Sequence, residues 1–217
     1  KIKKVAQIIS YKYSVGGQTY VFGTGHNHCI AEESLHRSGG FAGACPILDE
    51  NIDFSLGVKK ASKFERNKKL AKKILKKYNL KKNDLIIIFS NSGINQLPIE
   101  IAKIAKRKRI FVISVLSTKY LNSLVKARYK KLNNYSDLNI DNHTPKGDTL
   151  LQVKSTGISS ASTIAGIFIL NAIWAELSIL LKKEKPLPFY KSSNLPDSFE
   201  HNSFLEKKYS KRNKHLI

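Results

Sequence analysis

The chain has 217 residues, of which 41% are hydrophobic and 25% are charged, and its formal net charge at pH 7 is +22. This length and composition are typical of a globular domain that buries its own core, and they argue against a disordered chain, a collagen-like repeat and a membrane protein with several spans. The positive charge would attract polyanions, but it comes mostly from Lys spread along the whole chain, whereas specific recognition of bases and phosphates relies on the paired N–H groups of Arg. We therefore expect no specific nucleic-acid partner.

Cys29 and Cys45 are the only cysteines, and neither belongs to a CxxC pair or to a Cys/His cluster. The pattern of a disulfide framework or a zinc site is therefore missing, and we expect a reducing, cytoplasmic location. The first residues already show helical periodicity, without the apolar core of a signal peptide. Residues 164–181 approach the length of a membrane span, but Asn171 and Glu176 interrupt them. We interpret this segment as a buried core helix and expect no membrane partner, because a charged side chain is costly at the centre of a bilayer.

Helical and strand-like patterns alternate along the chain, as they do in proteins with a layered parallel sheet. The predicted helices are residues 1–13, 27–38, 65–80, 98–106 and 120–132, a long helix from about residue 160, and a polar helix in the C-terminal tail. The predicted strands are residues 19–22, 43–48, 84–89, 109–116, 138–141 and 150–153. Residues 84–89 (DLIIIF) form a continuous apolar run, which is typical of a parallel strand that is covered on both faces. The sequence therefore predicts an α/β fold.

In open α/β sheets, ligands bind outside the carboxyl ends of the strands, so the loops that follow the strands form the candidate site. Residues 22–28 (FGTGHNH) place Gly23 and Gly25 around Thr24, directly before a predicted helix. Glycines let the backbone approach a ligand, and a helix N-terminus favours an anion. The pattern is not GxGxxG, so it does not indicate a dinucleotide site, and a plain tight turn is the alternative.

Residues 90–95 (SNSGIN) follow the clearest predicted strand and precede a helix. Their two hydroxyls, two amide side chains and free backbone N–H groups at a helix N-terminus suit a phosphate group. A simple helix cap would explain one Ser and one Asn, but not four hydrogen-bonding side chains in six positions. We therefore predict a phosphate cradle here. Residues 157–163 (GISSAST) bring further hydroxyls to the start of the long helix, where on their own they would only cap it.

Together these loops resemble the sugar isomerase (SIS) family of phosphosugar-binding domains, in particular uncharacterised stand-alone members related to phosphoheptose isomerase. The family signature, Ser-x-Ser-Gly-x-Thr/Asn after a strand, is matched by residues 90–95, and the likeness extends to FGTGHNH at 22–28, SNSGINQLPIE at 90–100, Ser162-Thr163 and EHN at 200–202. The chain departs from its relatives at Asn27, where many carry Ser, and around residues 159–160, where a glycine-proline pair is replaced. The resemblance implies a three-layer αβα sandwich with a mostly parallel, flavodoxin-like central sheet. It also implies one domain over residues 1–217, with an N-terminal helix at 1–16 and a C-terminal tail and helix at 185–217.

The resemblance also implies roles for single residues. The phosphate of a sugar would be held by Ser90, Asn91, Ser92 and Asn95. The sugar would be enclosed by the turn of Gly23, Thr24, Gly25 and His26, together with Ser162 and Thr163. Isomerisation of an aldose to a ketose moves a proton between adjacent carbons, so it needs a positioned base and a group that helps to open the ring. Glu33, next to Glu32, is the expected base, and His201 and His26 are the expected acids or donors. The alternatives are an exposed helix carboxylate for Glu33 and a surface histidine for His201.

The function implied by the resemblance is a cytoplasmic protein that binds a phosphorylated sugar and isomerises it, or an amino-sugar phosphate, through an enediolate. A lyase that opens a sugar-phosphate ether and a non-catalytic phosphosugar sensor are the alternatives, because the fold alone does not prove catalysis. No cofactor and no metal are expected. A homodimer or larger homo-oligomer is expected by analogy with the family, with His201 reaching a neighbouring subunit.

Overall fold

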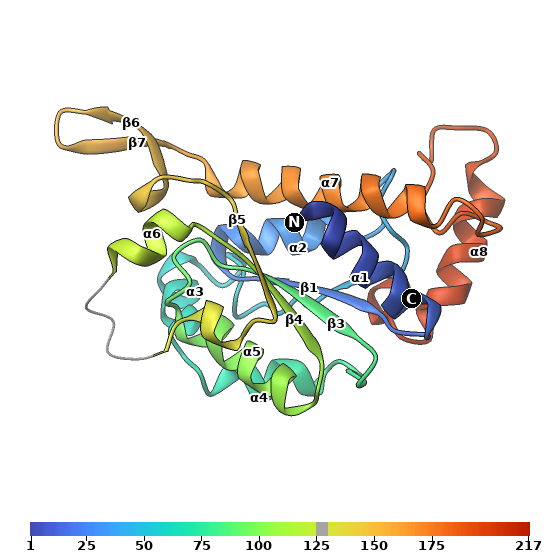
Figure 1. Ribbon diagram of the computed structural model, residues 1–217, viewed down its shortest axis with the longest axis horizontal. Coiled ribbons are helices and arrows are strands. Elements are labelled where there is room, and N and C mark those ends of the chain that lie inside the picture. The colour runs from blue at the N-terminus through green and yellow to red at the C-terminus, as the bar shows by residue number, and fades with distance from the viewer. Residues whose placement is uncertain (125–129) are drawn as a thin grey trace.

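A parallel five-stranded sheet forms the centre of the protein in a computed structural model that describes residues 1–124 and 130–217 (Figure 1). Its strands are β1 (Thr19–Gly23), β2 (Ala44–Pro46), β3 (Leu85–Phe89), β4 (Phe111–Leu116) and β5 (Leu138–Asp141). Their spatial order is β2-β1-β3-β4-β5, and every neighbouring pair is parallel. The chain leaves β1 in one direction to form β2 and returns on the other side to form β3. The gap between the carboxyl ends of β1 and β3 is therefore the switch point, where ligands bind in sheets of this order.

Helices cover both faces of the sheet (Figure 1). One face carries α1 (Ile2–Ser14), α2 (His28–Glu33) and α7 (Ser162–Leu180), and the other carries α3 (Val58–Glu65), α4 (Leu70–Lys76) and α5 (Gln96–Arg107). α6 (Thr118–Ser123) follows β4, and α8 (Ser198–Ser210) lies at one end of the molecule. Short 3-10 turns occupy Gly25–Asn27, Leu132–Tyr135, Lys146–Asp148 and Lys214–Leu216. The predicted three-layer αβα sandwich with a flavodoxin-like sheet is confirmed.

The two layers of helices explain the continuous apolar run of β3. Leu85 and Ile87 pack into the core below α1 and α7, whereas Ile86 and Ile88 pack into the core next to α4 and α5. All five residues of the strand are at most 1% exposed. Because successive side chains of a strand point to opposite faces, a strand buried on both faces has no position left for a polar residue.

Two of the predicted helices end earlier than expected. The helix predicted at residues 27–38 stops at Glu33, because the Ser34 hydroxyl bonds to the Ala31 carbonyl and His36 takes a left-handed backbone conformation. The helix predicted at 65–80 is found only as α4, from Leu70 to Lys76, whereas α3 occupies Val58–Glu65, ahead of the predicted range. The Asn67 side chain accepts the Lys69 N–H in the turn between the two helices. Such side chain to backbone bonds compete with helical ones.

The basic helix predicted at 120–132 begins earlier and is shorter than expected. Its described part is α6, which begins at Thr118 and ends at Ser123. Residues 125–129 of that prediction lie outside the described residues.

The strand predicted at residues 150–153 exists but does not join the central sheet. It is part of β6 (Thr149–Val153), which pairs antiparallel with β7 (Thr156–Ser160) in a hairpin that projects from the body of the protein (Figure 1). The predicted hydroxyl loop at 157–163 is therefore mostly a strand of this hairpin, because most of its residues pair with β6 rather than cap the following helix.

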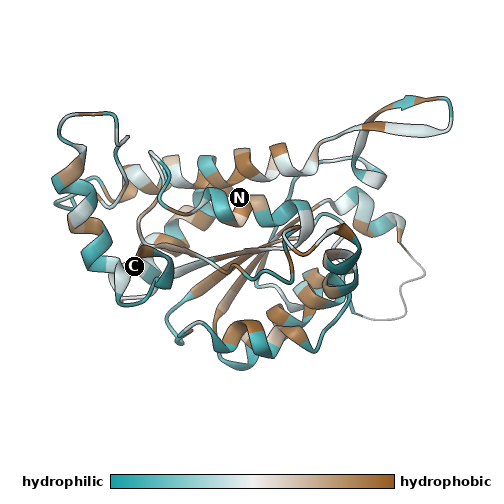
Figure 2. Cartoon of the chain, turned by 180° about the vertical axis from the view of Figure 1, so that it is seen from behind, coloured by the Kyte–Doolittle hydropathy of each residue, from teal (hydrophilic) through white to brown (hydrophobic). Residues whose placement is uncertain are grey.

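α7 was predicted to be a buried core helix, and this is correct for one side only. Leu170, Ile173 and Leu177 are fully buried against the sheet and α1, whereas Ile164 and Phe168 are 72% and 73% exposed. Figure 2 shows apolar residues on the outer as well as the inner side of this helix. Among the described residues, α7 is the one helix that is long and apolar enough to cross a membrane, and a third of its most apolar window is buried within the protein.

Candidate functional site

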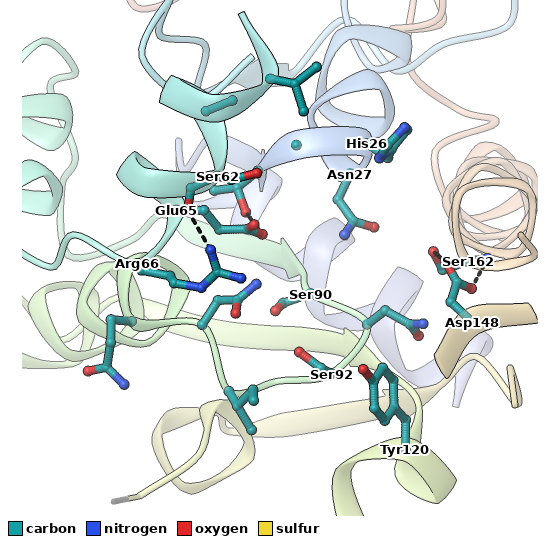
Figure 3. Close-up of a pocket in the computed structure, with 18 of the residues that line it drawn as sticks. His26, Asn27, Ser62, Glu65, Arg66, Ser90, Ser92, Tyr120, Asp148 and Ser162 are labelled. Carbon is teal, nitrogen blue, oxygen red and sulfur yellow. Dashed lines mark hydrogen bonds between the residues drawn. The ribbon is translucent and has the colours of Figure 1, made fainter. Parts of the chain in front are cut away.

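A cleft of about 560 Å³ lies at the carboxyl ends of β1 and β3, at the switch point of the sheet (Figure 3). Most of its walls come from the turn after β1, helix α3 with the residue that follows it, the turn between β3 and α5, and the residues on either side of the β6–β7 hairpin, and Phe54 and Tyr120 complete them. The turns after β1 and β3 are loops that the sequence singled out, and so is Ser162 beside the hairpin, whereas α3 was not singled out.

The turn after β1 brings its backbone close to the cleft. A Cβ atom at Gly23 would lie 2.1 Å from the carbonyl oxygen of Asn27, so no other residue fits without moving the turn. Gly25 has a φ of +56°, which only glycine adopts without strain, and its N–H donates to the carbonyl of Ile52 at 2.9 Å. Between the two glycines, Thr24 donates its hydroxyl to Oε1 of Glu65 at 2.7 Å. The turn is thereby tied to α3 across the cleft.

The turn between β3 and α5 offers hydrogen-bond donors that have no acceptor. It is closed by Gly93, whose φ is +66° and whose N–H donates to the Ser90 carbonyl at 3.1 Å. Within the described part of the chain, no partner is found for the hydroxyls of Ser90 and Ser92, nor for the backbone N–H groups of Ser92, Ile94, Asn95 and Gln96. Asn95 caps α5 without a bond from its own side chain. Unpaired N–H groups at a helix N-terminus next to free hydroxyls form an environment that suits an anion.

Asn91 holds this turn in place. Its Oδ1 accepts hydrogen bonds from the Thr144 hydroxyl at 2.8 Å and from Nδ2 of Asn142 at 3.0 Å. Its own Nδ2 is buried and has no partner among the described residues. The amide is therefore fixed from the side of β5, with its donor nitrogen unused.

Glu65 and Arg66 enter the cleft from the end of α3, which no pattern in the sequence indicates. The two residues lie at a helix boundary in a Lys-rich stretch, where they look like ordinary surface charges. The guanidinium of Arg66 donates to the carbonyl of Ser62 at 3.1 Å, and Figure 3 shows the side chains of Glu65 and Arg66 directed into the same cavity as Ser90 and Ser92. The cleft thus has one carboxylate and one guanidinium opposite the donor-rich turn.

Asp148 and Ser162 form the wall beneath the hairpin. Asp148 accepts the Ser162 hydroxyl at 2.6 Å on Oδ2 and the Ser162 N–H at 2.7 Å on Oδ1. The carboxylate therefore caps α7 and holds the two ends of the hairpin together. Ser162 lines the cleft as expected, but its hydroxyl is already engaged, and Thr163 does not line the cleft.

Of the three expected catalytic residues, the structure places one in the cleft and two outside it. His26 lines the cleft, and its ring lies 4.9 Å from the ring of Phe54. Glu33, at the end of α2, lies outside the cleft and pairs with Nε of Arg37 at 3.1 Å. His201, on α8, also lies outside it, and its Nε2 is 2.8 Å from the carbonyl oxygen of Phe189. Within one chain, Glu33 and His201 are therefore not brought to the cleft.

Among the residues that the structure describes, no group of three or more His, Cys, Asp or Glu side chains is arranged to hold a metal ion.

Comparisons with known proteins agree with this fold. The SIS domain family model matches residues 1–117, which include the turns after β1 and β3. A UPF0309 protein of Brucella anthropi is 39% identical to this chain, over 98% of this chain and 88% of its own length. A UPF0309 protein of Brucella canis is 36% identical, over 100% of this chain and 90% of its own length. The structure of phosphoheptose isomerase GmhA from Neisseria gonorrhoeae is also similar, with a TM-score of 0.51 and 12% sequence identity. The match covers 81% of this chain and 84% of the GmhA chain, so the two proteins share a fold. The chain belongs to the SIS domain family.

Proposed function

We propose that the cleft binds a phosphorylated sugar and catalyses its aldose–ketose isomerisation. The observation that carries this proposal is the division of the cleft into two chemically different ends. Free hydroxyl and N–H donors gather at the turn between β3 and α5, and the carboxylate of Glu65 lies on α3 across from them. A sugar phosphate has the same division, with an anionic ester at one end and a carbon acid next to a carbonyl at the other.

The phosphate group is placed at Ser90, Ser92 and the first turn of α5. The unpaired donors there meet the need of phosphate oxygens, and the positive end of the α5 dipole adds to the attraction. Asn91 contributes its unused Nδ2 or serves only to hold the turn, whereas Ser162 acts indirectly because Asp148 already holds its hydroxyl.

Glu65 is the base that the geometry favours, in place of Glu33. It lines the cleft, and one of its oxygens is held by Thr24, which leaves the other oxygen with no partner among the described residues. Asp148 also lines the cleft, but both of its oxygens accept bonds from Ser162. Glu33 is turned towards Arg37 outside the cleft. A carboxylate that is positioned but still free on one oxygen is suited to proton transfer.

The reaction assigns a task to each of these groups. The Glu65 carboxylate removes the proton from the carbon next to the carbonyl, and the electron pair of that C–H bond forms the enediolate double bond while charge collects on the carbonyl oxygen. Arg66 is placed to stabilise this oxygen by its positive charge, and His26 is placed to donate to a sugar hydroxyl or to the ring oxygen. The proton of the neighbouring hydroxyl then moves to the former carbonyl oxygen, and the proton held by Glu65 is delivered to the former carbonyl carbon, so that the neighbouring carbon becomes the new carbonyl and aldose and ketose are exchanged.

A thermal-shift comparison tests the binding half of the proposal. Fructose 6-phosphate and glucosamine 6-phosphate should raise the melting temperature, whereas fructose and glucosamine should not, because the unpaired donors need an oxyanion. A ligand present at a hundred times its Kd adds about 2.7 kcal/mol to the free energy of unfolding. Equal stabilisation by the sugars and their phosphates would show that the turn does not bind phosphate.

Deuterium incorporation from D₂O tests the catalytic half. Wild-type protein should exchange the proton on the carbon next to the carbonyl of a sugar phosphate that it binds. Glu65→Gln should still bind this ligand but exchange about 10²- to 10⁴-fold more slowly, since general base catalysis contributes that much. Glu33→Gln is the matched control, because it makes the same change of charge outside the cleft and should exchange at close to the wild-type rate. A loss in Glu33→Gln alone would return the role of base to Glu33, and binding without any exchange would favour a non-catalytic phosphosugar sensor.

A further inference from the structure

A second cavity, of about 510 Å³, lies at the amino ends of the strands, at the opposite end of the sheet from the cleft. Gln18 and Gly43, which directly precede β1 and β2, form part of its wall. The rest of the wall comes from the end of α1 and the turn after it, the segment after α7, and the end of α8. Figure 1 shows the end of α1 and α8 at the end of the molecule away from α3, which lines the cleft. We call this the α1–α8 cavity, and its volume is within the range of about 300 to 1,000 Å³ that is usual for small-molecule sites.

Buried polar atoms without a partner gather in this wall. Eight buried side-chain atoms have no hydrogen-bond partner among the described residues, and three of them line this cavity, namely Nε2 and Oε1 of Gln18 and Nε of Arg212. Two more, on Asn91 and Gln96, line the cleft. Buried polar groups are almost always paired, because leaving one unpaired costs free energy. The feature that marks the cleft as a binding site therefore recurs in the α1–α8 cavity.

The backbone of Gln18 is fixed, whereas its side-chain amide is not engaged. Its N–H donates to Oδ1 of Asp84 at 2.9 Å, and the other oxygen of this fully buried carboxylate accepts Nη2 of Arg212 at 2.7 Å. Gln18 is 4% exposed, so its amide lies deep in the wall.

The amide of Gln18 specifies the kind of group that it can pair with. An amide side chain presents a donor and an acceptor side by side, so its complement is a group with an acceptor and a donor side by side. The edge of a nucleobase has this arrangement, and glutamine pairs in this way with the N6 amino group and N7 of adenine. A trans secondary amide, such as an acetamido group, has its N–H and C=O on opposite sides and does not fit. Free phosphate does not fit either, because Oε1 of Gln18 needs a donor.

Charged groups lie at the opening of the cavity. Lys208 donates to the Tyr13 hydroxyl at 3.3 Å, and this hydroxyl donates to Oε2 of Glu184 at 3.4 Å. Lys208 and Glu184 are both exposed, and Lys208 has no carboxylate partner among the described residues. A lysine ammonium suits a phosphate group, and a carboxylate accepts hydrogen bonds from ribose hydroxyls. The cavity thus has a neutral pairing edge in its depth and charged groups of both signs at its opening.

We propose that the α1–α8 cavity is a second ligand site, which takes an adenine nucleotide with AMP as the simplest example. The base pairs with the amide of Gln18, the ribose hydroxyls reach Glu184, and the phosphate pairs with Lys208. The site stands apart from the proposed isomerase reaction, because the two cavities share no lining residue.

Isothermal titration calorimetry with AMP, adenosine and orthophosphate tests the site in the wild-type chain. AMP should bind, and adenosine should bind about tenfold more weakly because it lacks the charged contact with Lys208. Saturating fructose 6-phosphate should change the affinity for AMP by no more than about twofold, since the sites are separate. AMP should also bind the Ser90→Ala/Ser92→Ala double variant as it binds wild type, and it should bind even if no sugar phosphate does. Absence of AMP binding, displacement of AMP by fructose 6-phosphate, or binding of orthophosphate as tight as that of AMP would overturn the proposal.

Gln18→Leu tests the pairing edge at nearly constant side-chain volume. It should weaken AMP binding about tenfold or more, as the loss of a bidentate contact to a base does. The melting temperature of the ligand-free variant should not fall, because the amide has no bond to lose. Gln7→Leu, at an exposed position of α1 outside the cavity, is the matched control and should bind AMP like wild type. Wild-type affinity in Gln18→Leu, or tighter binding of GMP or UMP than of AMP to the wild-type chain, would refute the assignment of the base.

Lys208→Ala tests the phosphate end without touching the buried wall. It should weaken AMP binding about tenfold and leave adenosine binding unchanged, because adenosine has no phosphate. Lys207→Ala removes the same charge at the preceding exposed position of α8, which does not line the cavity, and it should leave both affinities near those of wild type. Equal losses in the two variants would show a general effect of charge and would contradict the placement of the phosphate at Lys208.

Discussion

The phosphate cradle makes a quantitative prediction. In Ser90→Ala and Ser92→Ala, one hydroxyl that has no partner among the described residues is lost from the turn between β3 and α5, while the backbone N–H groups of Ile94, Asn95 and Gln96 remain. Each hydroxyl that donates to a phosphate oxygen contributes about 1.5–3 kcal/mol, as hydrogen bonds to charged groups do. Each single substitution should therefore weaken binding of a sugar phosphate by roughly ten- to a hundredfold. The double substitution should weaken it by at least about a hundredfold, although neighbouring sites need not add.

Isothermal titration calorimetry with the sugar phosphate that gives the largest thermal shift measures these losses directly. Ser210→Ala is the control, because the Ser210 hydroxyl bonds to the Lys207 carbonyl on α8, away from the cleft. Because these hydroxyls have no partner among the described residues, the melting temperatures of the ligand-free variants should stay near that of wild type. Wild-type affinity in the Ser90→Ala/Ser92→Ala double variant would refute the placement of the phosphate.

Three further predictions concern the turn after β1, acid stability and polyanions. Gly23→Ala should lower the free energy of unfolding by about 1–3 kcal/mol in urea titrations, as overpacking does, and should weaken ligand binding, because the new Cβ would collide with the Asn27 carbonyl. Burial by itself would raise the pKa of Asp49, but the hydrogen bond from Lys77 at 2.6 Å and the bonds from Asn51 outweigh it and hold this pKa below its ordinary value. The stability that Asp49 contributes is therefore present above about pH 4 and is lost as the pH falls through the lowered pKa. Asp49→Asn should lower the melting temperature at pH 7 and flatten the decline of the melting temperature below about pH 4. An acid profile identical to that of wild type would contradict this. Binding to duplex DNA should be weak, without sequence preference, and lost by about 0.2 M salt in fluorescence anisotropy, because dispersed lysines release counterions without reading bases.

The central architecture could be predicted from the sequence because its signals are local. The apolar run of β3, the alternation of helical and strand-like segments and the position of Gly93 after a strand each depend on neighbouring residues, and all three are found as expected. The loops that follow β1 and β3 also meet at one cleft, because the carboxyl ends of parallel strands lie at the same edge of a sheet. Local patterns and the general rules of parallel sheets were therefore enough for the fold class and for half of the cleft.

The other half of the cleft depended on packing between distant segments. Glu65 and Arg66 reach the cleft only because α3 ends against the turn after β1, where Thr24 bonds to Glu65 across forty-one positions of sequence. Glu33 follows the turn closely in sequence, yet it faces Arg37 outside the cleft, since the direction of a side chain on a short helix is set by how that helix packs.

The hairpin and α7 show the same division between local pattern and packing. Leu150 to Val153 have the composition of a strand, and the sequence identified this strand, but its own residues do not say whether it pairs with the adjacent β7 or joins the distant strands of the central sheet. The hydropathy of α7 is so even that its sequence has no buried side or exposed side to recognise. The sequence by itself determined which segments are helices and strands and which turns suit an anion, because those properties follow from neighbouring residues. Only the tertiary structure decided which carboxylate enters the cleft and which apolar residues stay uncovered, because both depend on contacts between residues that are distant in sequence.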